Sequence, residues 1–391
     1  MVIVFENLFG QGYEGGANWL ETALLALGTL ELPPTCLVWG ASKEALPQSL
    51  KDAAHVHPVT ISRPESSRIN RLKDSTIRRI LRRPWEGRAV TELAVSRNVD
   101  LWVGFSGFKE LGAHRPLIVW YPDFQFRHFP ELFDNQELRD RERQWNFVAT
   151  RADAIIAISQ AVARDALANH HAQIADKLYV CGFPPIFTLS HLKQDPDGIR
   201  QRYHLPERFF LVCNQFWQHK NHALVLKACK YLKENGATPP VIAFTGLPHD
   251  YRRPELFSDL QRFVNEHALH EFCRFLGVLP RDHQIALIRA ATAIIQPSKF
   301  EGRGAIVEEA TLLGAQLLCS DLPVHRELHA PEALFFPPDD VEELADLLNR
   351  EYKPSTKDAQ TITDESKRLA RAYGEELMAV CKRVLERRQT V

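Results

Sequence analysis

The chain alternates short runs of β-branched and aromatic residues with longer segments in which apolar residues recur at helical spacing. This alternation is typical of βαβ units arranged around parallel sheets. The runs that we expect to be strands fall into two series. The first lies at 2–5, 35–39, 101–105, 117–120, 154–158 and 178–181, and the second at 209–213, 241–245, 273–276, 293–296, 316–319 and 333–336. The pattern therefore predicts an α/β protein with two sheets.

A proline-containing segment separates the two series. Residues 182–198, GFPPIFTLSHLKQDPDG, have no helical or strand period, and we interpret them as an interdomain linker. A chain of 391 residues is also too long for one ordinary hydrophobic core. We expect a Rossmann-like domain over 1–185, a second over 186–370, and a closing helix over 371–391. Apolar residues at helical spacing predict that this helix extends back to about 363.

Composition narrows the class of protein. The formal net charge is −1, which argues against a dedicated nucleic-acid binder. Seven scattered cysteines without a CxxC pair indicate reduced thiols, and the first residues lack the basic region of a signal peptide. No apolar run approaches the roughly 18–20 residues of a transmembrane helix. We therefore expect a cytoplasmic protein that at most visits the inner face of the membrane.

One segment is strongly basic. Residues 63–97 include SRINRLKDSTIRRILRRPWEGR, which is rich in Arg and Lys and poor in acids. Two interpretations stay open: the solvated face of a helix, or a surface that contacts anionic lipid or a lipid-diphosphate acceptor at the membrane.

A glycine-rich loop follows the first predicted strand. Gly10, Gly12, Gly15 and Gly16 stand directly before the helical stretch ANWLETALLAL. Unpaired amides at a helix N-terminus attract anions, and glycine lets a phosphate or sugar approach the backbone. The loop is a candidate binding site for such a group, with a purely steric turn as the alternative.

The second half carries a more specific pattern, AIIQPSKFEGRGAIVEEATLLGAQLLCSD. Glu301 and Glu309 bracket a junction between a loop and a helix that we expect to start near Gly304. The amides of Arg303, Gly304 and Ala305 could face a diphosphate. The two carboxylates could accept hydrogen bonds from hydroxyls of a sugar and a ribose.

This segment resembles the donor-site signature of the family 4 retaining glycosyltransferases of the GT-B fold, a Glu, seven residues and a second Glu. The resemblance implies that Glu301 contacts the donor sugar, that Glu309 contacts the ribose, and that Gly302 belongs to the donor loop. It also implies two Rossmann-like domains with parallel sheets facing across a donor cleft. Residues 1–185 would bind the acceptor, 186–370 the nucleotide sugar, and the C-terminal helix would pack back on the N-terminal domain.

Further positions match the same family. In FFLVCNQFWQHKNHALVLKACKYL, Lys220 matches the lysine that binds donor phosphate, and a mobile point charge suits a leaving diphosphate. Gln215, also a candidate donor-site residue, stands where many relatives carry Arg. Arg303 is therefore either a substitute phosphate clamp or a solvent-facing loop residue. The Gly277 loop is expected to flank the nucleotide base through backbone contacts.

The first half resembles the family at its acceptor-side loop, WYPDFQFRHFPELF. Asp123 and His128 are the candidate catalytic residues there. Pro122 occupies a place where relatives often have His, and the variant PDFQ is typical of a bacterial polysaccharide subgroup. Ser159 is interpreted only as a helix N-cap.

The resemblance implies retention of anomeric configuration through an oxocarbenium-like state, with the departing diphosphate helping to deprotonate the acceptor. A protein base or orienting acid would be Asp123 first and His128 second. The expected reaction moves a hexosyl-type sugar from a nucleotide-diphosphate sugar to a glycan or lipid-linked acceptor in polysaccharide biosynthesis. We expect no cofactor, because the nucleotide sugar is a substrate, and no metal.

Two other functions stay open. Gln215, Arg303 and Pro122 favour a non-catalytic nucleotide-sugar or glycan-binding protein with a decayed site. A GT-B sugar-nucleotide epimerase or phosphorylase would share the architecture but not the carboxylate spacing. A nicotinamide dehydrogenase is disfavoured, because no GxGxxG follows the first strand.

Overall fold

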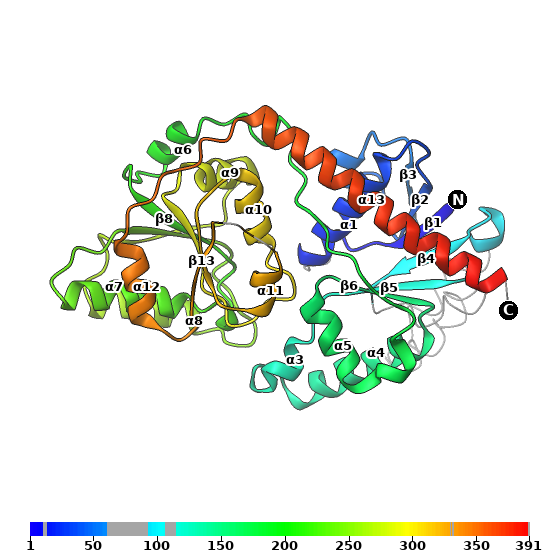
Figure 1. Ribbon diagram of the computed structural model, residues 1–391, viewed down its shortest axis with the longest axis horizontal. Coiled ribbons are helices and arrows are strands. Elements are labelled where there is room, and N and C mark those ends of the chain that lie inside the picture. Colours follow the sequence, from blue (N-terminus) through cyan, green and yellow to red (C-terminus); the bar gives the residue numbers. More distant parts are fainter. Residues whose placement is uncertain (11–13, 61–92, 106–114, 329, 331, 390–391) are drawn as a thin grey trace, which may run out of the picture. The chain divides into compact units, whose positions relative to one another are not determined.

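The computed structural model describes residues 1–10, 14–60, 93–105, 115–328, 330 and 332–389. The chain forms two compact units (Figure 1). Unit 1 comprises Met1–Phe124, Asp134–Phe183 and Leu369–Val391, and unit 2 comprises Gln125–Phe133 and Pro184–Arg368. The changes of unit at 183/184 and 368/369 lie two residues before the expected boundaries at 185/186 and 370/371. The transfer of Gln125–Phe133 to unit 2 was not expected.

The described strands of unit 1 form a seven-stranded sheet in the order β3-β2-β1-β4-β5-β6-β7, with every pairing parallel. The strands are β1 (Val2–Glu6), β2 (Thr35–Trp39), β3 (Val56–Val59), β4 (Leu101–Gly104), β5 (Leu117–Tyr121), β6 (Ala154–Ala157) and β7 (Leu178–Val180). Its helices include α1 (Glu14–Gly28), η1 (Gln48–Leu50), α4 (Asn135–Arg151), α5 (Gln160–Ile174) and the end of α13 (Ala359–Gln389).

The described strands of unit 2 form a six-stranded parallel sheet in the order β10-β9-β8-β11-β12-β13. They are β8 (Phe209–Cys213), β9 (Val241–Thr245), β10 (Cys273–Gly277), β11 (Ala293–Gln296), β12 (Leu317–Ser320) and β13 (Leu334–Phe336). The helices include α3 (Gln125–His128), η4 (Pro130–Leu132), α6 (Pro196–Arg202), η5 (Gln218–Lys220), α7 (His222–Glu234), α8 (Leu256–Glu266), α9 (Arg281–Ala290), α10 (Ala305–Leu313), α11 (Pro323–Glu327), α12 (Val341–Asn349) and the first part of α13.

All twelve predicted strands are present, and their ends differ from the prediction by at most one residue. Among the described strands, β3 was not predicted. Its sequence VHPV contains Pro58, which cannot donate to a sheet ladder and breaks the pattern. Proline is tolerated at a sheet edge, and β3 is the edge strand of its sheet.

Apolar strands are buried on both faces because helices cover both sides of a parallel sheet. In unit 1, Trp19 of α1 stacks on Trp120 of β5 with ring centroids 4.7 Å apart. On α4, Trp145 packs edge-on against Tyr121 at 4.8 Å. In unit 2 the core gathers side chains from β8, β9, β11 and the helices α7, α8 and α12.

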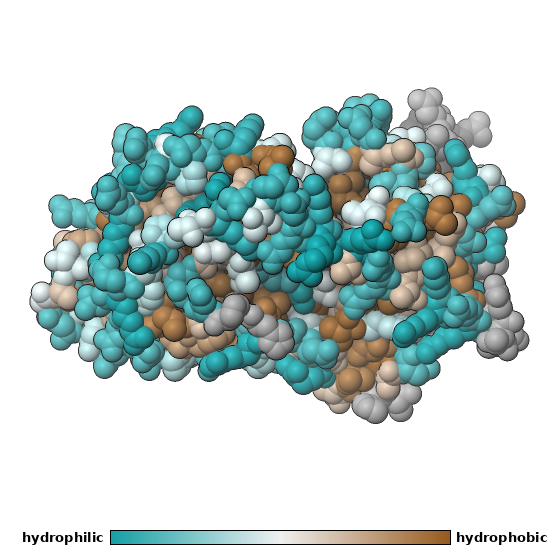
Figure 2. Space-filling model, turned by 45° about the horizontal axis from the view of Figure 1, so that its top comes forward, coloured by the Kyte–Doolittle hydropathy of each residue, from teal (hydrophilic) through white to brown (hydrophobic). Residues whose placement is uncertain are grey.

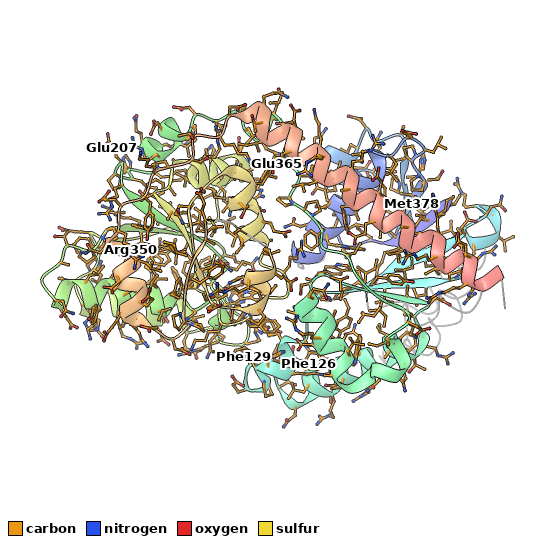
Figure 3. All side chains as sticks on the ribbon, viewed as in Figure 1. Phe126, Phe129, Glu207, Arg350, Glu365 and Met378 are labelled. Atoms are coloured by element: carbon orange, nitrogen blue, oxygen red, sulfur yellow. The ribbon has the colours of Figure 1, made fainter. Side chains whose placement is uncertain are left out.

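The long C-terminal helix is confirmed as α13, and its last part packs on unit 1 as predicted (Figure 1). Gly374 makes this contact close, because a Cβ there would lie 2.5 Å from the Ala26 carbonyl oxygen of α1. In Figure 3, Glu365 and Met378 mark the parts of α13 before and after it changes unit.

Each sheet has a point at which the strand order reverses. It lies between β1 and β4 in unit 1 and between β8 and β11 in unit 2. The loops that leave two such strands go to opposite faces of the sheet, and ligands of open α/β sheets bind in the crevice between them. The fold therefore directs attention to the loops after β8 and β11.

The surface in Figure 2 is mostly hydrophilic, with hydrophobic residues in separate patches. Among the described residues, Leu32, Val95 and Val278 are the most exposed large apolar ones, at 89%, 69% and 67%. None of the described helices is long and apolar enough to cross a membrane. Most of the basic segment 63–97 lies outside the described residues, so its membrane contact stays a prediction.

Candidate donor site

Lys220 ends a short 3-10 turn, η5, that follows β8. The backbone N–H of Gln218, the first residue of the turn, donates to Asp250 Oδ2 at 3.0 Å. The carbonyl of His219 accepts from the backbone N–H of Lys299 at 2.8 Å. These bonds tie the turn to the loops after β9 and β11, so the backbone that carries Lys220 is fixed.

Asn221 completes the turn in a left-handed conformation, with φ of 57°. Its side-chain N–H groups donate to the carbonyls of Pro297 at 3.1 Å and Pro338 at 2.8 Å. Asparagine tolerates this conformation better than most residues. The same residue thus ends η5, begins α7 and attaches both to the loops after β11 and β13.

Glu301 lies in the loop after β11 and pairs with Lys220. Its Oε1 accepts hydrogen bonds from Lys220 Nζ at 2.7 Å, Gln296 Nε2 at 2.6 Å and Ser298 Oγ at 2.7 Å. The side chains of Lys220 and Glu301 are only 18% and 10% exposed. Burial raises the pKa of Glu301, but Lys220, His325 and the donated hydrogen bonds outweigh it and hold this pKa below its ordinary value.

Gln296 ends β11 and bridges the reversal point of the sheet. Asn214, directly after β8, donates to Gln296 Oε1 at 2.8 Å. Because that oxygen is occupied, the amide N–H groups of Gln296 are directed to Ser298 and Glu301. A buried polar network thus orients the carboxylate before any ligand arrives.

The next helix, α10, begins at Ala305, close to the predicted start. Gly304 precedes it with φ of 87°, a conformation that L side chains rarely adopt. A Cβ at Gly304 would also come within 3.2 Å of the buried His325 ring. Ala305 is exposed, whereas Ile306 and Val307 are buried, so α10 begins at the surface of the unit.

His325 of α11 packs against Gly304, at the start of α10. Its Nδ1 is 2.8 Å from the Ser320 carbonyl oxygen, which can only accept, so Nδ1 carries the proton. Burial lowers the pKa of His325, opposed by Glu301 and that carbonyl. The ring is therefore neutral near pH 7.

Arg303 is not a solvent-facing residue, so that interpretation is wrong. Its guanidinium pairs with Glu308, with Nε 2.9 Å from Oε2, and the two side chains are 16% and 15% exposed. Burial raises the pKa of Glu308, and Arg303 acts in the opposite direction. The role of Arg303 as a phosphate clamp stays a prediction.

Glu309 is held by Arg281, the first residue of α9. Two N–H groups of the guanidinium face the two carboxylate oxygens at 2.5 and 3.0 Å. Arg281 also donates to Gln284 at 2.8 Å. Each oxygen of Glu309 keeps a second lone pair, which leaves the carboxylate able to accept from vicinal hydroxyls.

Gly277 and Gln215 lie at the same carboxyl edge of the sheet. Gly277 has φ of 69° at a register shift in β10, and its carbonyl accepts from the Gly246 N–H at 2.9 Å. A Cβ on Gly246 would lie 2.2 Å from the Asn214 carbonyl oxygen, so the backbones approach closely beside the half-buried Gln215. Their contacts with a nucleotide stay predictions.

His128 reaches this region and Asp123 belongs to unit 1. The His128 ring lies 5.2 Å from the ring of Phe300, the residue before Glu301. Figure 3 labels Phe126 and Phe129 of the same segment, and Phe129 also packs against Phe300 at 6.2 Å. Asp123 is half-buried after β5, and its catalytic role stays a prediction.

In unit 1, Gly15 and Gly16 lie inside the first turn of α1, which begins at Glu14. The helix therefore starts earlier than predicted, and these two glycines are helical rather than part of the loop. Ser159 is confirmed as an N-cap, because its Oγ accepts from the Val162 N–H at 3.0 Å. The roles of Gly15 and Gly16 in binding stay predictions.

Several residues that organise these sites were not predicted from the sequence. At the reversal point of unit 1, Glu6 Oε2 accepts from the Phe105 N–H at 2.7 Å, and burial raises the pKa of Glu6 to about 7 against that bond. Gln296, Ser298 and Arg281 were also missed. The available signal was local: a polar residue ends an otherwise apolar strand at Glu6 and Gln296. For Arg281 the sequence offers no such signal, since its partner is 28 positions away.

Comparison with known proteins finds a matching family over the second half of the chain. Residues 198–368 match the family model described as glycosyl transferases group 1. A serotype-specific mannosyltransferase, WbdA of Escherichia coli, is 25% identical over 213 residues, covering 51% of this chain and 24% of that protein. The chain thus matches about a quarter of the length of this relative.

Solved structures share the fold over the whole chain. HepE of Anabaena, in complex with UDP and glucose, has a TM-score of 0.65 at 19% identity and covers 100% of this chain and 99% of its own. Sucrose-phosphate synthase of Thermosynechococcus elongatus has a TM-score of 0.65 at 15% identity, with 100% and 98% covered. The predicted GT-B class, with two Rossmann-like domains, is confirmed. Residues 198–368 of this chain are thus similar to the group 1 glycosyl transferases, and the chain has a GT-B fold.

Proposed function

We propose that the protein is a retaining glycosyltransferase that moves a hexosyl unit from a nucleoside-diphosphate sugar to a glycan or lipid-linked acceptor, in polysaccharide biosynthesis. The observation that carries the proposal is the buried Lys220–Glu301 pair, 2.7 Å apart at the reversal point of the unit 2 sheet. The mannosyltransferase relative and the HepE structures with UDP and with UDP-glucose support a nucleotide-sugar donor.

In this proposal Lys220 acts on the leaving group. Negative charge grows on the diphosphate as the glycosidic bond breaks, and a fixed ammonium stabilises the transition state more than the ground state. The first-turn amides of α10, and Arg303 if it leaves Glu308, would add to this stabilisation. Glu301 keeps Lys220 in place and contacts the donor sugar.

Glu309 would bind the ribose through the lone pairs that Arg281 leaves open. Glu309→Ala should weaken donor binding, whereas Glu301→Ala should lower turnover more than nucleotide affinity. Comparing a ribonucleotide with its 2′-deoxy analogue separates the two effects, since only the Glu309 variant should lose discrimination between them.

The test is donor turnover. UDP-glucose, GDP-mannose, ADP-glucose and dTDP-glucose are each offered with and without a chelator, and the released sugar is followed by NMR immediately after release. We expect one donor to be consumed with its anomeric configuration retained, with chelator present. Lys220→Ala should abolish this reaction, and Lys227→Ala, an exposed lysine of α7, should not.

Three outcomes would contradict parts of the proposal. Inversion of configuration would overturn the retaining mechanism, and loss of activity with chelator would overturn metal independence. Binding of a nucleotide without any turnover would favour the decayed-site alternative.

A further inference from the structure

A short segment from the N-terminal half of the chain is part of unit 2. The chain leaves unit 1 after Phe124, forms α3 and η4 within Gln125–Phe133, and returns to unit 1 at Asp134. Helical turns of four and three residues are too short to be stable alone, so tertiary contacts must hold this segment.

Arg252 contacts both ends of this segment. Its Nη1 donates to Gln125 Oε1 at 2.9 Å, and its guanidinium carbon lies 5.2 Å from the ring centroid of Phe133. The Arg252 side chain is only 5% exposed. A planar guanidinium can donate in its plane and pack on aromatic faces at once, which a lysine ammonium cannot do.

The same arginine is attached to the turn that carries Lys220. Asp250 Oδ1 accepts from the backbone N–H of Arg252 at 3.0 Å and from its Nε at 3.2 Å. Asp250 Oδ2 accepts from the Gln218 N–H, which begins the turn. The guanidinium also lies 5.1 Å from the ring centroid of Trp217. The Arg252–Asp250 ion pair therefore joins the segment to η5, the turn that carries Lys220.

The middle of the segment contacts the loop after β11, which carries Glu301. His128 and Phe129 pack on Phe300, which precedes Glu301 in sequence. His128 is exposed at the surface of unit 2 while it packs there. The segment is thus held by Arg252 at its ends and lies on the Glu301 loop at its centre.

We propose that Arg252 is a positioning residue for the transfer reaction, because it docks the segment 125–133 and so holds His128 beside the donor loop, where a hydroxyl acceptor would be oriented. The inference rests on the proposed function. Arg252 itself need not touch a substrate. Its contribution is the geometry of His128 relative to Glu301 and Lys220.

The test compares three variants by donor turnover, with water as the acceptor hydroxyl, and by nucleotide affinity. Gln125→Ala removes the segment's side of the contact and leaves Asp250 untouched. Arg252→Lys keeps the charge beside Asp250 but not the planar group. His128→Phe keeps a ring on Phe300 and removes the imidazole. Arg253→Lys, at the neighbouring surface arginine that is 39% exposed, is the matched control.

We expect Gln125→Ala and Arg252→Lys each to lower kcat about 10- to 100-fold, as misplacement of a reacting group does. Affinity for the nucleoside diphosphate should stay within about twofold, because the Asp250 bond to the donor turn remains. Combining Gln125→Ala with His128→Phe should give no larger loss than His128→Phe alone, because the first acts through the second.

Losses that multiply in the double variant would overturn the inference, and so would an Arg252→Lys enzyme with the kcat of Arg253→Lys. These results are distinct from failure of the proposed function. A wild-type protein that neither binds nor consumes any of the four donors would overturn both.

Discussion

Replacing Glu301 by alanine is the perturbation whose size can best be worked from the structure. It removes the acceptor of three hydrogen bonds and leaves the 18%-exposed Lys220 ammonium without its counter-charge. Breaking a buried pair by removing one partner costs about 3–5 kcal/mol. Lys220 keeps some access to water, so we expect the lower end, about 3 kcal/mol in the free energy of unfolding.

In a domain of this size, 1 kcal/mol shifts Tm by roughly 2–4 °C, so Glu301→Ala should lower the Tm of unit 2 by about 6–12 °C. Differential scanning fluorimetry measures the shift. Exposed Glu271→Ala is the control, and it should change stability by less than about 0.5 kcal/mol.

For the same variant we also predict the effect of a bound diphosphate on stability, which should offset the loss. A bound diphosphate would supply the anion that Lys220 has lost, so it should stabilise Glu301→Ala at least as much as wild type. Turnover should nevertheless fall by about 100-fold or more, the usual cost of losing one fixed electrostatic element. A Tm equal to that of Glu271→Ala, or normal turnover, would refute the reasoning.

The remaining predictions concern pH and packing. Burial raises the pKa of Glu6 from 4.5 to about 7, so its contribution to the free energy of unfolding of unit 1 is present below pH 4.5 and is lost as the pH rises to 7. Glu6→Gln should make the Tm of unit 1 less dependent on pH over this range. A pH profile of Tm equal to that of wild type would contradict this. Burial lowers the pKa of His222 from 6.5 to about 3, so its contribution to the free energy of unfolding of unit 2 is lost as the pH falls from 6.5 to 3. His222→Phe should therefore reduce the loss of Tm in acid. A Tm that falls with pH as steeply as in wild type would count against this. Gly374→Ala should lower Tm, because overpacking against α1 costs about 1–3 kcal/mol while helix propensity returns only about 1; a higher Tm would disprove the close contact.

How far the sequence predicts the fold depends on how local each signal is. Strands such as β8 and β11 are short apolar runs, so their existence and ends could be predicted. The edge strand β3 could not, because Pro58 removes the pattern and only its position in the sheet makes it tolerable.

In the site, too, single residues could be predicted from local patterns but their contacts could not. Lys220 and Glu301 could be singled out from the segments around them, but their contact follows from the adjacency of β8 and β11, which no local pattern contains. The placement of Gln125–Phe133 in unit 2 depends on Arg252, 127 positions from its partner Gln125. Long-range partners of this kind become visible only in the folded chain.

The most direct test of the central claim, that Lys220 and its neighbours bind a nucleoside diphosphate, is a thermal-shift panel with GDP, UDP, dTDP, ADP and CMP. At a hundredfold excess over Kd, a ligand that binds only the native state stabilises it by about 2.7 kcal/mol. We predict that one diphosphate raises the Tm of the wild-type protein and that Lys220→Ala loses most of this shift, whereas Lys227→Ala keeps it. No shift with any nucleotide, or a full shift in Lys220→Ala, would contradict the account.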